Sequence, residues 1–207
     1  MEFKNYIFDM DGTIWDAAEM AARGFTAGIR ASGMSDRVVT VEDIHRNFGL
    51  TLEQVAVNLL PELSEREAVA VILECVKHQY GEMDGHVGEM VYPQFEATLQ
   101  RLKERGCGLY IVSNCLDGYL DILYRNLDVK RYIDGDAWLH HPMHCKADNI
   151  RYIVDKYQLT DACYVGDIQG DYEASRQAGV EFVFAAYGYG DVPEAKYIIN
   201  QFSDLGR

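Results

Sequence analysis

Short apolar runs recur through the second half of the chain and occur once near its beginning. Each run is rich in β-branched or aromatic residues, does not alternate with polar residues, and is bounded by Gly, Asp or Asn, which is typical of strands buried on both faces. The predicted strands cover residues 6–8, 109–112, 137–139, 163–165 and 182–185. Helical patterns separate the later runs, as where Ile150, Ile153, Val154 and Tyr157 form one apolar stripe. This order predicts an α/β fold with a doubly wound parallel sheet.

A long gap between the first two predicted strands breaks this rhythm. About a hundred residues is several times what one crossover helix requires. The gap contains only helical signals, including capping boxes at Ser64–Glu67 and Thr51–Gln54. The apolar stripes after these caps and in the first helix are Val69, Ile72, Leu73, Val76 and Tyr80; Leu52, Val55 and Leu59; and Ala18, Ala22, Phe25 and Ile29. The pattern therefore predicts a helical cap subdomain at residues 15–89, inserted into a core made of residues 1–14 and 90–207.

The composition narrows the classes of partner and compartment. The chain has 207 residues and 33 Asp+Glu against 19 Lys+Arg, giving a net charge of −14, which argues against binding to nucleic acid or to an anionic membrane surface. No apolar run approaches the roughly 18 residues that a membrane span needs. The five cysteines are widely spread and include no CxxC pair. Together with a buried strand at the very start, they predict a cytoplasmic protein with reduced thiols.

Polar residues follow the predicted strands where the carboxyl ends of parallel strands meet at one edge of the sheet, the edge that binds ligands in open α/β folds. Asp9 and Asp11 end the first strand two positions apart, so both side chains can face the same side. Gly12 then permits a sharp turn, and Thr13 offers a hydroxyl. Other residues at this edge are Ser113 and Asn114, Lys146, Asp167 and Asp171.

Four carboxylates at one edge, Asp9, Asp11, Asp167 and Asp171, would repel one another strongly in a cleft of low dielectric. A hard divalent cation relieves that repulsion, and Mg²⁺ prefers oxygen ligands together with a substrate phosphate. A fixed lysine, a serine hydroxyl and backbone amides near Asn114 would hold the remaining phosphate oxygens. The residue types therefore predict a Mg²⁺-assisted phosphoryl site.

The segments FDMDGT, IVSN, the isolated Lys146 and VGDIQGD, in that order, resemble the four motifs of the haloacid dehalogenase superfamily. The resemblance covers the whole chain and lies closest to the branch of phosphoglycolate phosphatase and β-phosphoglucomutase. It implies a Rossmann-like core with a helical cap. It also implies that Asp9 is the nucleophile that becomes an aspartyl-phosphate and that Asp11 is the general acid and base.

The same resemblance implies the remaining roles at the site. Asp9, Asp11 through its backbone carbonyl, and Asp167 would hold Mg²⁺, with Asp171 as a direct or supporting ligand. Ser113 and Lys146 would bind the phosphoryl group, with Asn114, Gly12 and Thr13 completing its loop. Asp171 could instead only cap the helix that follows it.

The resulting hypothesis is a Mg²⁺-dependent phosphatase that acts on a small phosphorylated metabolite, as a monomer or a homodimer. One alternative is a sugar phosphomutase of the β-phosphoglucomutase type, which the resemblance disfavours weakly because such mutases often carry a bulkier residue where Thr13 stands. Another is a non-catalytic phosphate-binding module, but Asp9 and Asp11 are intact. A general acidic partner-binding protein would explain the composition but not the motifs.

Three further segments invite a functional interpretation. The run His140–Cys145, with His140, His141 and His144, suggests zinc, but its spacing favours a solvated loop near the cleft. The loop Tyr187–Gly190 lacks the context of a dinucleotide site and is expected to be a flexible cleft edge. In the cap, the turn Arg46–Gly49 is the candidate specificity loop. At the hinge, Trp15 and Asp16 are expected to serve packing and helix capping.

Overall fold

A computed structural model describes residues 2–139 and 141–206 and divides the chain into two compact units. The first unit comprises the residues up to Asp16 and those from Met90 onward, and the second is Ala17–Glu89. Trp15 and Asp16 thus lie in the first unit. Across the described residues, no helix has the length and apolar character to cross a membrane.

The first unit is built on a six-stranded parallel sheet in the order β3-β2-β1-β4-β5-β6. Because β1 lies in the middle and the chain proceeds outward on both sides of it, the predicted doubly wound α/β class is confirmed. The strands are β1 (Asn5–Phe8), β2 (Gly108–Val112), β3 (Gly135–Ala137), β4 (Ala162–Gly166), β5 (Glu181–Ala185) and β6 (Tyr197–Ile199). The sequence pattern missed β6 and placed the third strand two residues too late.

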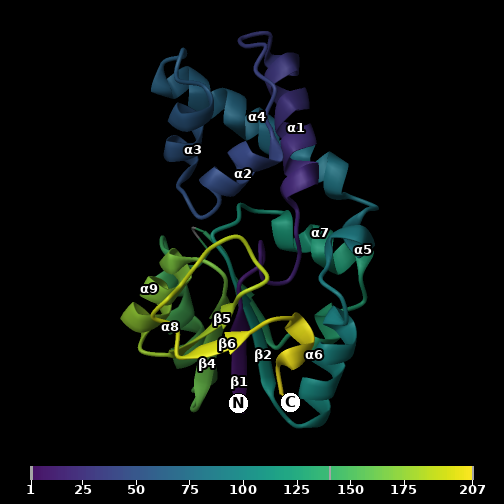
Figure 1. The fold of residues 1–207 in the computed structure, drawn as a ribbon, viewed down its shortest axis with the longest axis vertical. Coiled ribbons are helices and arrows are strands. Elements are labelled where there is room, and N and C mark those ends of the chain that lie inside the picture. The colour runs from purple at the N-terminus through teal and green to yellow at the C-terminus, as the bar shows by residue number, and fades with distance from the viewer. Residues whose placement is uncertain (1, 140, 207) are drawn as a thin grey trace. The chain divides into compact units, whose positions relative to one another are not determined.

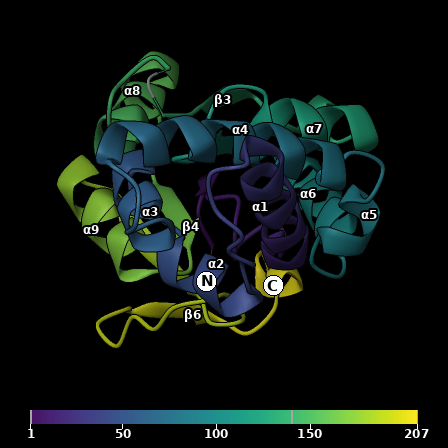
Figure 2. The same ribbon diagram turned by 90° about the horizontal axis from the view of Figure 1, so that it is seen from above.

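Helices cover both faces of this sheet (Figures 1 and 2). On one face Ile7, Tyr164 and Phe182 join a core with residues of α8 and α9. On the other face Phe8 packs against Phe202, which also contacts Phe95 of α6. The helices of this unit are α6 (Phe95–Glu104), α7 (Tyr119–Asn126), α8 (Lys146–Tyr157) and α9 (Gln169–Ala178), with 3₁₀ turns η1 (Lys130–Tyr132) and η2 (Phe202–Asp204). Burial on both faces explains why the strands read as continuous apolar runs.

The second unit is helical and has its own apolar core. Its helices are α1 (Ala18–Ser32), α2 (Val41–Asn47), α3 (Leu52–Leu59) and α4 (Glu65–Met83), and α5 (Val87–Met90) lies at its boundary. Capping boxes begin α2, α3 and α4, as Thr40, Thr51 and Ser64 each accept a hydrogen bond from the backbone three residues on. The predicted turn at Arg46–Gly49 needs correction, because Arg46 and Asn47 form the end of α2 and Arg46 pairs with Glu42 one turn earlier.

Helices α1 and α4 approach each other closely through two glycines. A Cβ atom on Gly24 would lie 2.3 Å from the Cα of Gln79, and one on Gly28 would lie 2.5 Å from the Cα of Cys75. Such distances leave no room for any side chain at these two positions of α1. On α4, Cys75 and the predicted core residue Ile72 are buried, while Leu73, also predicted to be in the core, is 43% exposed.

Candidate active site

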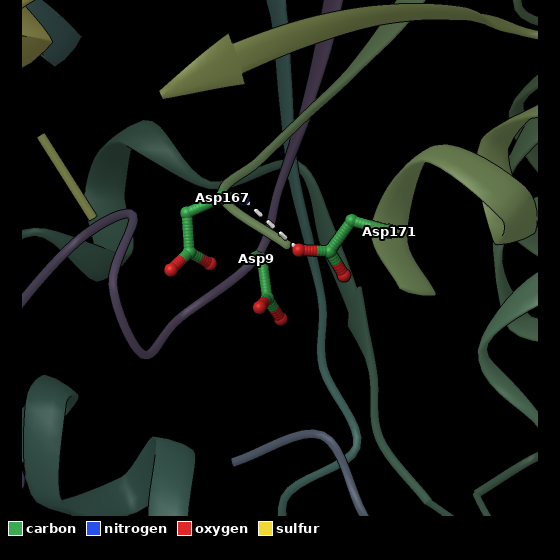
Figure 3. A group of neighbouring side chains, drawn as sticks. All are labelled: Asp9, Asp167 and Asp171. Atoms are coloured by element: carbon green, nitrogen blue, oxygen red, sulfur yellow. Dashed lines mark hydrogen bonds between the residues drawn. The ribbon is translucent and has the colours of Figure 1, made fainter. Parts of the chain in front are cut away.

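Three carboxylates meet at the carboxyl edge of the sheet, all within the α/β unit. Asp9 follows β1, and its N–H donates to the carbonyl of Val165 at 2.9 Å, so the ladder with β4 holds it beside Asp167. Asp171 reaches the same point from the first turn of α9. Each of Asp9, Asp167 and Asp171 is buried and offers an oxygen within 4.8 Å of the others (Figure 3). This is the only such group of potential metal ligands within residues 2–139 and 141–206.

A buried lysine joins this group from the start of α8. The Nζ atom of Lys146 lies 2.6 Å from Oδ1 of Asp171 and 3.1 Å from Oδ1 of Asp9. Burial alone would lower the pKa of Lys146, but the carboxylates of Asp171 and Asp9 outweigh it and hold that pKa well above its usual value. The side chain is therefore a fixed positive charge, suited to binding an anionic group.

Asp171 both caps α9 and orders the site. Its Oδ2 accepts hydrogen bonds from the N–H groups of Asp167 and Ile168, at 3.0 and 3.2 Å, while its Oδ1 accepts from Lys146. Both oxygens thus have protein donors, and the helix-capping role expected as an alternative coexists with contact to the site. This arrangement favours Asp171 as the residue that orients Lys146 and the backbone of Asp167.

The negative charge of the cluster exceeds what Lys146 balances. Burial, opposed by Lys146, raises the pKa of Asp9 to about 7, and burial together with the charges of Asp171 and Asp9 raises the pKa of Asp167 to about 8. Asp167 also accepts the N–H of Tyr189 at Oδ2, at 2.8 Å. An all-oxygen set of donors with excess negative charge, buried at one point, fits a hard cation such as Mg²⁺.

The carboxyl group of Asp11 lies outside that cluster. Its Oδ1 accepts hydrogen bonds from the O–H of Tyr119 at 2.6 Å and from the Nε1–H of Trp15 at 3.0 Å. Burial raises the pKa of Asp11 to about 6, although these two donors oppose the shift. Of the four carboxylates expected together, Asp11 therefore has a separate position, which leaves its backbone carbonyl as the group it could offer to a metal.

The candidate phosphate-binding residues lie in the loops after β1 and β2. Ser113 follows β2, the neighbour of β1, and its Oγ accepts the N–H of Cys115 at 3.2 Å. In the described part of the chain, Oγ1 of Thr13 and Oδ1 of Asn114 are buried polar atoms without a hydrogen-bond partner. Unsatisfied buried atoms are costly, so their presence here is suited to a polar ligand.

Two loop glycines shape the space around Asp167. Gly12 has a φ of +75°, and a Cβ there would lie 2.0 Å from Oδ2 of Asp167; a Cβ on Gly188 would lie 2.3 Å from the Cβ of Asp167. The loop that contains Gly188 is also bonded to the site, because the O–H of Tyr187 donates to the carbonyl of Thr13 at 2.9 Å. The segment expected to be a flexible cleft edge thus forms one wall of the acidic site.

Sequence reasoning missed Tyr119, placed Tyr189 only in a flexible loop at the cleft edge, and assigned Trp15 to packing and helix capping. Trp15 is fully buried and packs edge-on against Tyr119, with ring centroids 5.1 Å apart, while its indole N–H reaches Asp11. Tyr189 donates its O–H to Asp16 at 2.8 Å. The Tyr-Gly-Tyr-Gly run begins two residues after the carboxyl end of β5, a position at the ligand-binding edge of the sheet.

Ring stacking and side-chain hydrogen bonds fix the histidine loop before Lys146. His141 stacks on Trp138, with ring centroids 4.2 Å apart, and Asn149 binds the loop through the carbonyl of Trp138 and the N–H of Met143. His140 lies outside the described residues. The described part of this loop contributes no member to a metal-binding group.

Comparisons with known proteins show the family to which the chain belongs. The family model of haloacid dehalogenase-like hydrolases matches residues 6–185. Phosphoglycolate phosphatase of Vibrio vulnificus is 30% identical over 203 residues, covering 91% of this chain and 86% of that protein.

Solved structures share the fold over nearly the whole chain. A haloacid dehalogenase-like hydrolase of Streptococcus pneumoniae superposes with a TM-score of 0.81 at 20% identity, covering 98% of this chain and 96% of that one. CbbY of Rhodobacter sphaeroides in complex with phosphate superposes with a TM-score of 0.83 at 17% identity, covering 99% and 97%. The chain belongs to the haloacid dehalogenase-like hydrolase family, in its branch of phosphatases that resemble phosphoglycolate phosphatase.

Proposed function

We propose that this phosphatase is magnesium-dependent, acts on a small phosphorylated metabolite, and works through a phosphoryl group carried on Asp9. The observation that carries the proposal is the position of Asp9, which is buried, 3.1 Å from the Nζ of Lys146, and grouped with Asp167 and Asp171. A carboxylate that must attack a phosphate dianion needs nearby positive charge, and this site combines a fixed ammonium with a donor set for a cation.

The reaction proceeds in two displacements at phosphorus. A carboxylate oxygen of Asp9 attacks, the bond from phosphorus to the substrate alcohol breaks, and Asp11 gives its proton to the departing oxygen. Asp11 then takes a proton from water, whose oxygen attacks the same phosphorus. The bond to Asp9 breaks, inorganic phosphate leaves, and both carboxyl groups return to their starting states.

The other residues hold the phosphoryl group during these steps. Lys146 neutralises one oxygen, and the hydroxyls of Ser113 and Thr13, the latter without a partner in the described structure, donate further hydrogen bonds. Asp9, Asp167 and the backbone carbonyl of Asp11 would hold Mg²⁺, with Asp171 behind them. The ion, when bound, supplies positive charge against the phosphoryl oxygens as charge develops in the transition state.

The substrate class follows from the relatives and from the second unit. We propose that residues 17–89 act as the cap that selects the substrate and excludes water, as the insertion within the core suggests. Since curated relatives are phosphoglycolate phosphatases, 2-phosphoglycolate is the first substrate to test, followed by a panel of sugar phosphates. The same relatives favour hydrolysis over the phosphomutase alternative, which transfers the phosphoryl group back to a sugar.

The test is hydrolysis of p-nitrophenyl phosphate with and without Mg²⁺, by the wild type and by Asp9→Asn. We expect turnover that requires Mg²⁺ and that falls at least ~10³-fold in the variant, because the nucleophile is lost. Turnover that survives Asp9→Asn would contradict the proposed nucleophile. Absence of turnover with p-nitrophenyl phosphate and every phosphate of the panel, combined with interconversion of sugar phosphates, would instead identify a mutase.

A further inference from the structure

Two donors hold one oxygen of Asp11, and both come from the α/β unit. The O–H of Tyr119 and the Nε1–H of Trp15 converge on Oδ1, at 2.6 and 3.0 Å. Tyr119 is 3% exposed and Trp15 is fully buried, so water has little access to either donor. A side chain bonded twice through one oxygen has little freedom to rotate.

The sequence explains how Tyr119 reaches this position. It is the first residue of α7, directly after Gly118, whose φ of +85° turns the chain back from the Ser113–Asn114 loop toward the end of β1. The edge-on contact with Trp15 then fixes the phenol ring. The loop after β2, which supplies candidate phosphate ligands, therefore leads directly into the residue that holds Asp11.

Because both donors occupy Oδ1, the exchangeable proton of Asp11 belongs on Oδ2. An oxygen that accepts two hydrogen bonds has little capacity to carry a proton of its own, whereas the second oxygen keeps a free lone pair. Proton transfer by a carboxyl group depends on the direction in which its O–H points. The pair of donors would thus set both the rotamer and the oxygen that meets the leaving group.

We infer that Tyr119 is a positioning residue for acid catalysis: with Trp15, its hydroxyl fixes Asp11 so that Oδ2 delivers the proton to the departing alcohol. The inference rests on the proposed function and adds a residue that the four motifs do not include. It predicts that Tyr119 matters most where the leaving group needs a proton, since p-nitrophenolate leaves readily without one and an alkoxide does not.

The test compares kcat/KM for p-nitrophenyl phosphate and for an alkyl phosphate, with Mg²⁺, in the wild type and in Tyr119→Phe. The parameter kcat/KM reports the steps up to phosphoryl transfer to Asp9, before the water step that both substrates share. We expect kcat/KM for the alkyl phosphate to fall about tenfold further than that for p-nitrophenyl phosphate, as a lost charge-assisted hydrogen bond would give. Equal losses on both substrates would show a merely structural role and would overturn the inference, as would no loss on either.

A control and a second variant complete the design. Tyr124, on the same helix, also donates its hydroxyl to a carboxylate, that of Asp136, at 2.7 Å. Tyr124→Phe should leave unchanged the ratio of kcat/KM for the alkyl phosphate to kcat/KM for p-nitrophenyl phosphate. Trp15→Phe removes the other donor and should move the ratio in the same direction, so the inference is tested even if one variant folds poorly. A wild type without activity on either phosphate would overturn the proposed function itself, a result distinct from equal losses in the variant.

Discussion

Lys146 and Asp171 form a buried ion pair, with Nζ and Oδ1 2.6 Å apart, at the centre of the site. Because the charge of Lys146 also faces Asp9, its removal leaves two buried carboxylates without compensation. We expect Lys146→Met to abolish turnover and to lower the free energy of unfolding by about 3 kcal/mol at pH 8. Urea unfolding measures the second effect.

The matched control is the surface pair of Lys103 and Asp134, 2.7 Å apart and partly exposed. Lys103→Met should cost less than about 1 kcal/mol, because solvent screens such pairs. Adding Asp171→Asn to Lys146→Met should recover part of the lost stability by removing one uncompensated charge. Equal losses at the two lysines would contradict the strong coupling inferred for the buried pair.

The raised pKa values of Asp9 and Asp167, about 7 and about 8, predict how stability depends on pH. In the unfolded chain these carboxyl groups titrate near their ordinary value of 3.8, so between that pH and about 8 the folded state binds more protons. Their contribution to stability is therefore complete below pH 3.8, decreases as pH rises above it, and is lost once pH has passed about 7 and about 8, the folded-state pKa values. Without Mg²⁺, Tm should fall between pH 6 and pH 8.5.

Magnesium should reverse this trend, because the ion and the protons compete for the same oxygens. The rise in Tm on adding Mg²⁺ is expected to be larger at pH 8 than at pH 6. Thermal unfolding at several Mg²⁺ concentrations measures it, and Asp167→Asn should remove most of the difference. A rise of the same size at both pH values would argue against metal binding at this cluster.

Gly188 should be intolerant of any side chain. A Cβ there would lie 2.3 Å from the Cβ of Asp167 and 2.5 Å from the carbonyl oxygen of Gly12, so Asp167 or the Gly12 backbone would have to shift. We expect Gly188→Ala to raise the Mg²⁺ concentration needed for half-maximal activity and to cost about 1–3 kcal/mol of stability. Gly170→Ala is the control, since its nearest contact would be the end of the Ile168 side chain at 3.7 Å. Similar behaviour of the two variants would disprove this account.

The close contact between α1 and α4 predicts the effect of a substitution at Gly28. Gly28→Ala would place a methyl group 2.5 Å from the backbone of Cys75 and force α1 away from α4, at a cost of about 1–3 kcal/mol. Gly81→Ala, in α4 with open space around it, should instead stabilise the protein by about 0.5–1 kcal/mol. Urea unfolding of both variants decides the matter, and a neutral Gly28→Ala would show that the helices can separate freely.

Much of the α/β fold could be predicted because its strands are buried on both faces and end in recognisable loops. The third strand was predicted too late in the sequence because Trp138 looked like part of it. In the structure Trp138 instead exchanges backbone hydrogen bonds with His141. Strand β6 was missed because it is three residues long and lies at the edge, where Ile198 is 55% exposed. In α4 the predicted apolar stripe was right for Ile72, which is buried, and for Val69 and Val76, which pack against the same core, but wrong for Leu73, which is 43% exposed.

The candidate site could be predicted as far as local motifs reach. Asp9, Lys146, Asp167 and Asp171 follow from the order of strands and helices, and the structure groups them. The direction of the Asp11 side chain could not be predicted, because it depends on Tyr119, a donor 108 positions away. The chemistry of a single side chain at a strand end can be predicted from the sequence. The orientation of a side chain that depends on a partner far away in the sequence cannot.

The parallel pairing of β1 with β4 also has a consequence for synthesis of the chain. Tyr6 pairs with Cys163, and the hydroxyl of Tyr187 bonds the carbonyl of Thr13 across 174 positions, so these contacts wait until most of the polypeptide has left the ribosome. The helical unit closes its core within residues 17–89 and can order much earlier. Until β2 emerges, β1 stays unpaired with apolar side chains on both faces, a state prone to aggregation. The capacity for catalysis is thus among the last properties that a nascent chain acquires.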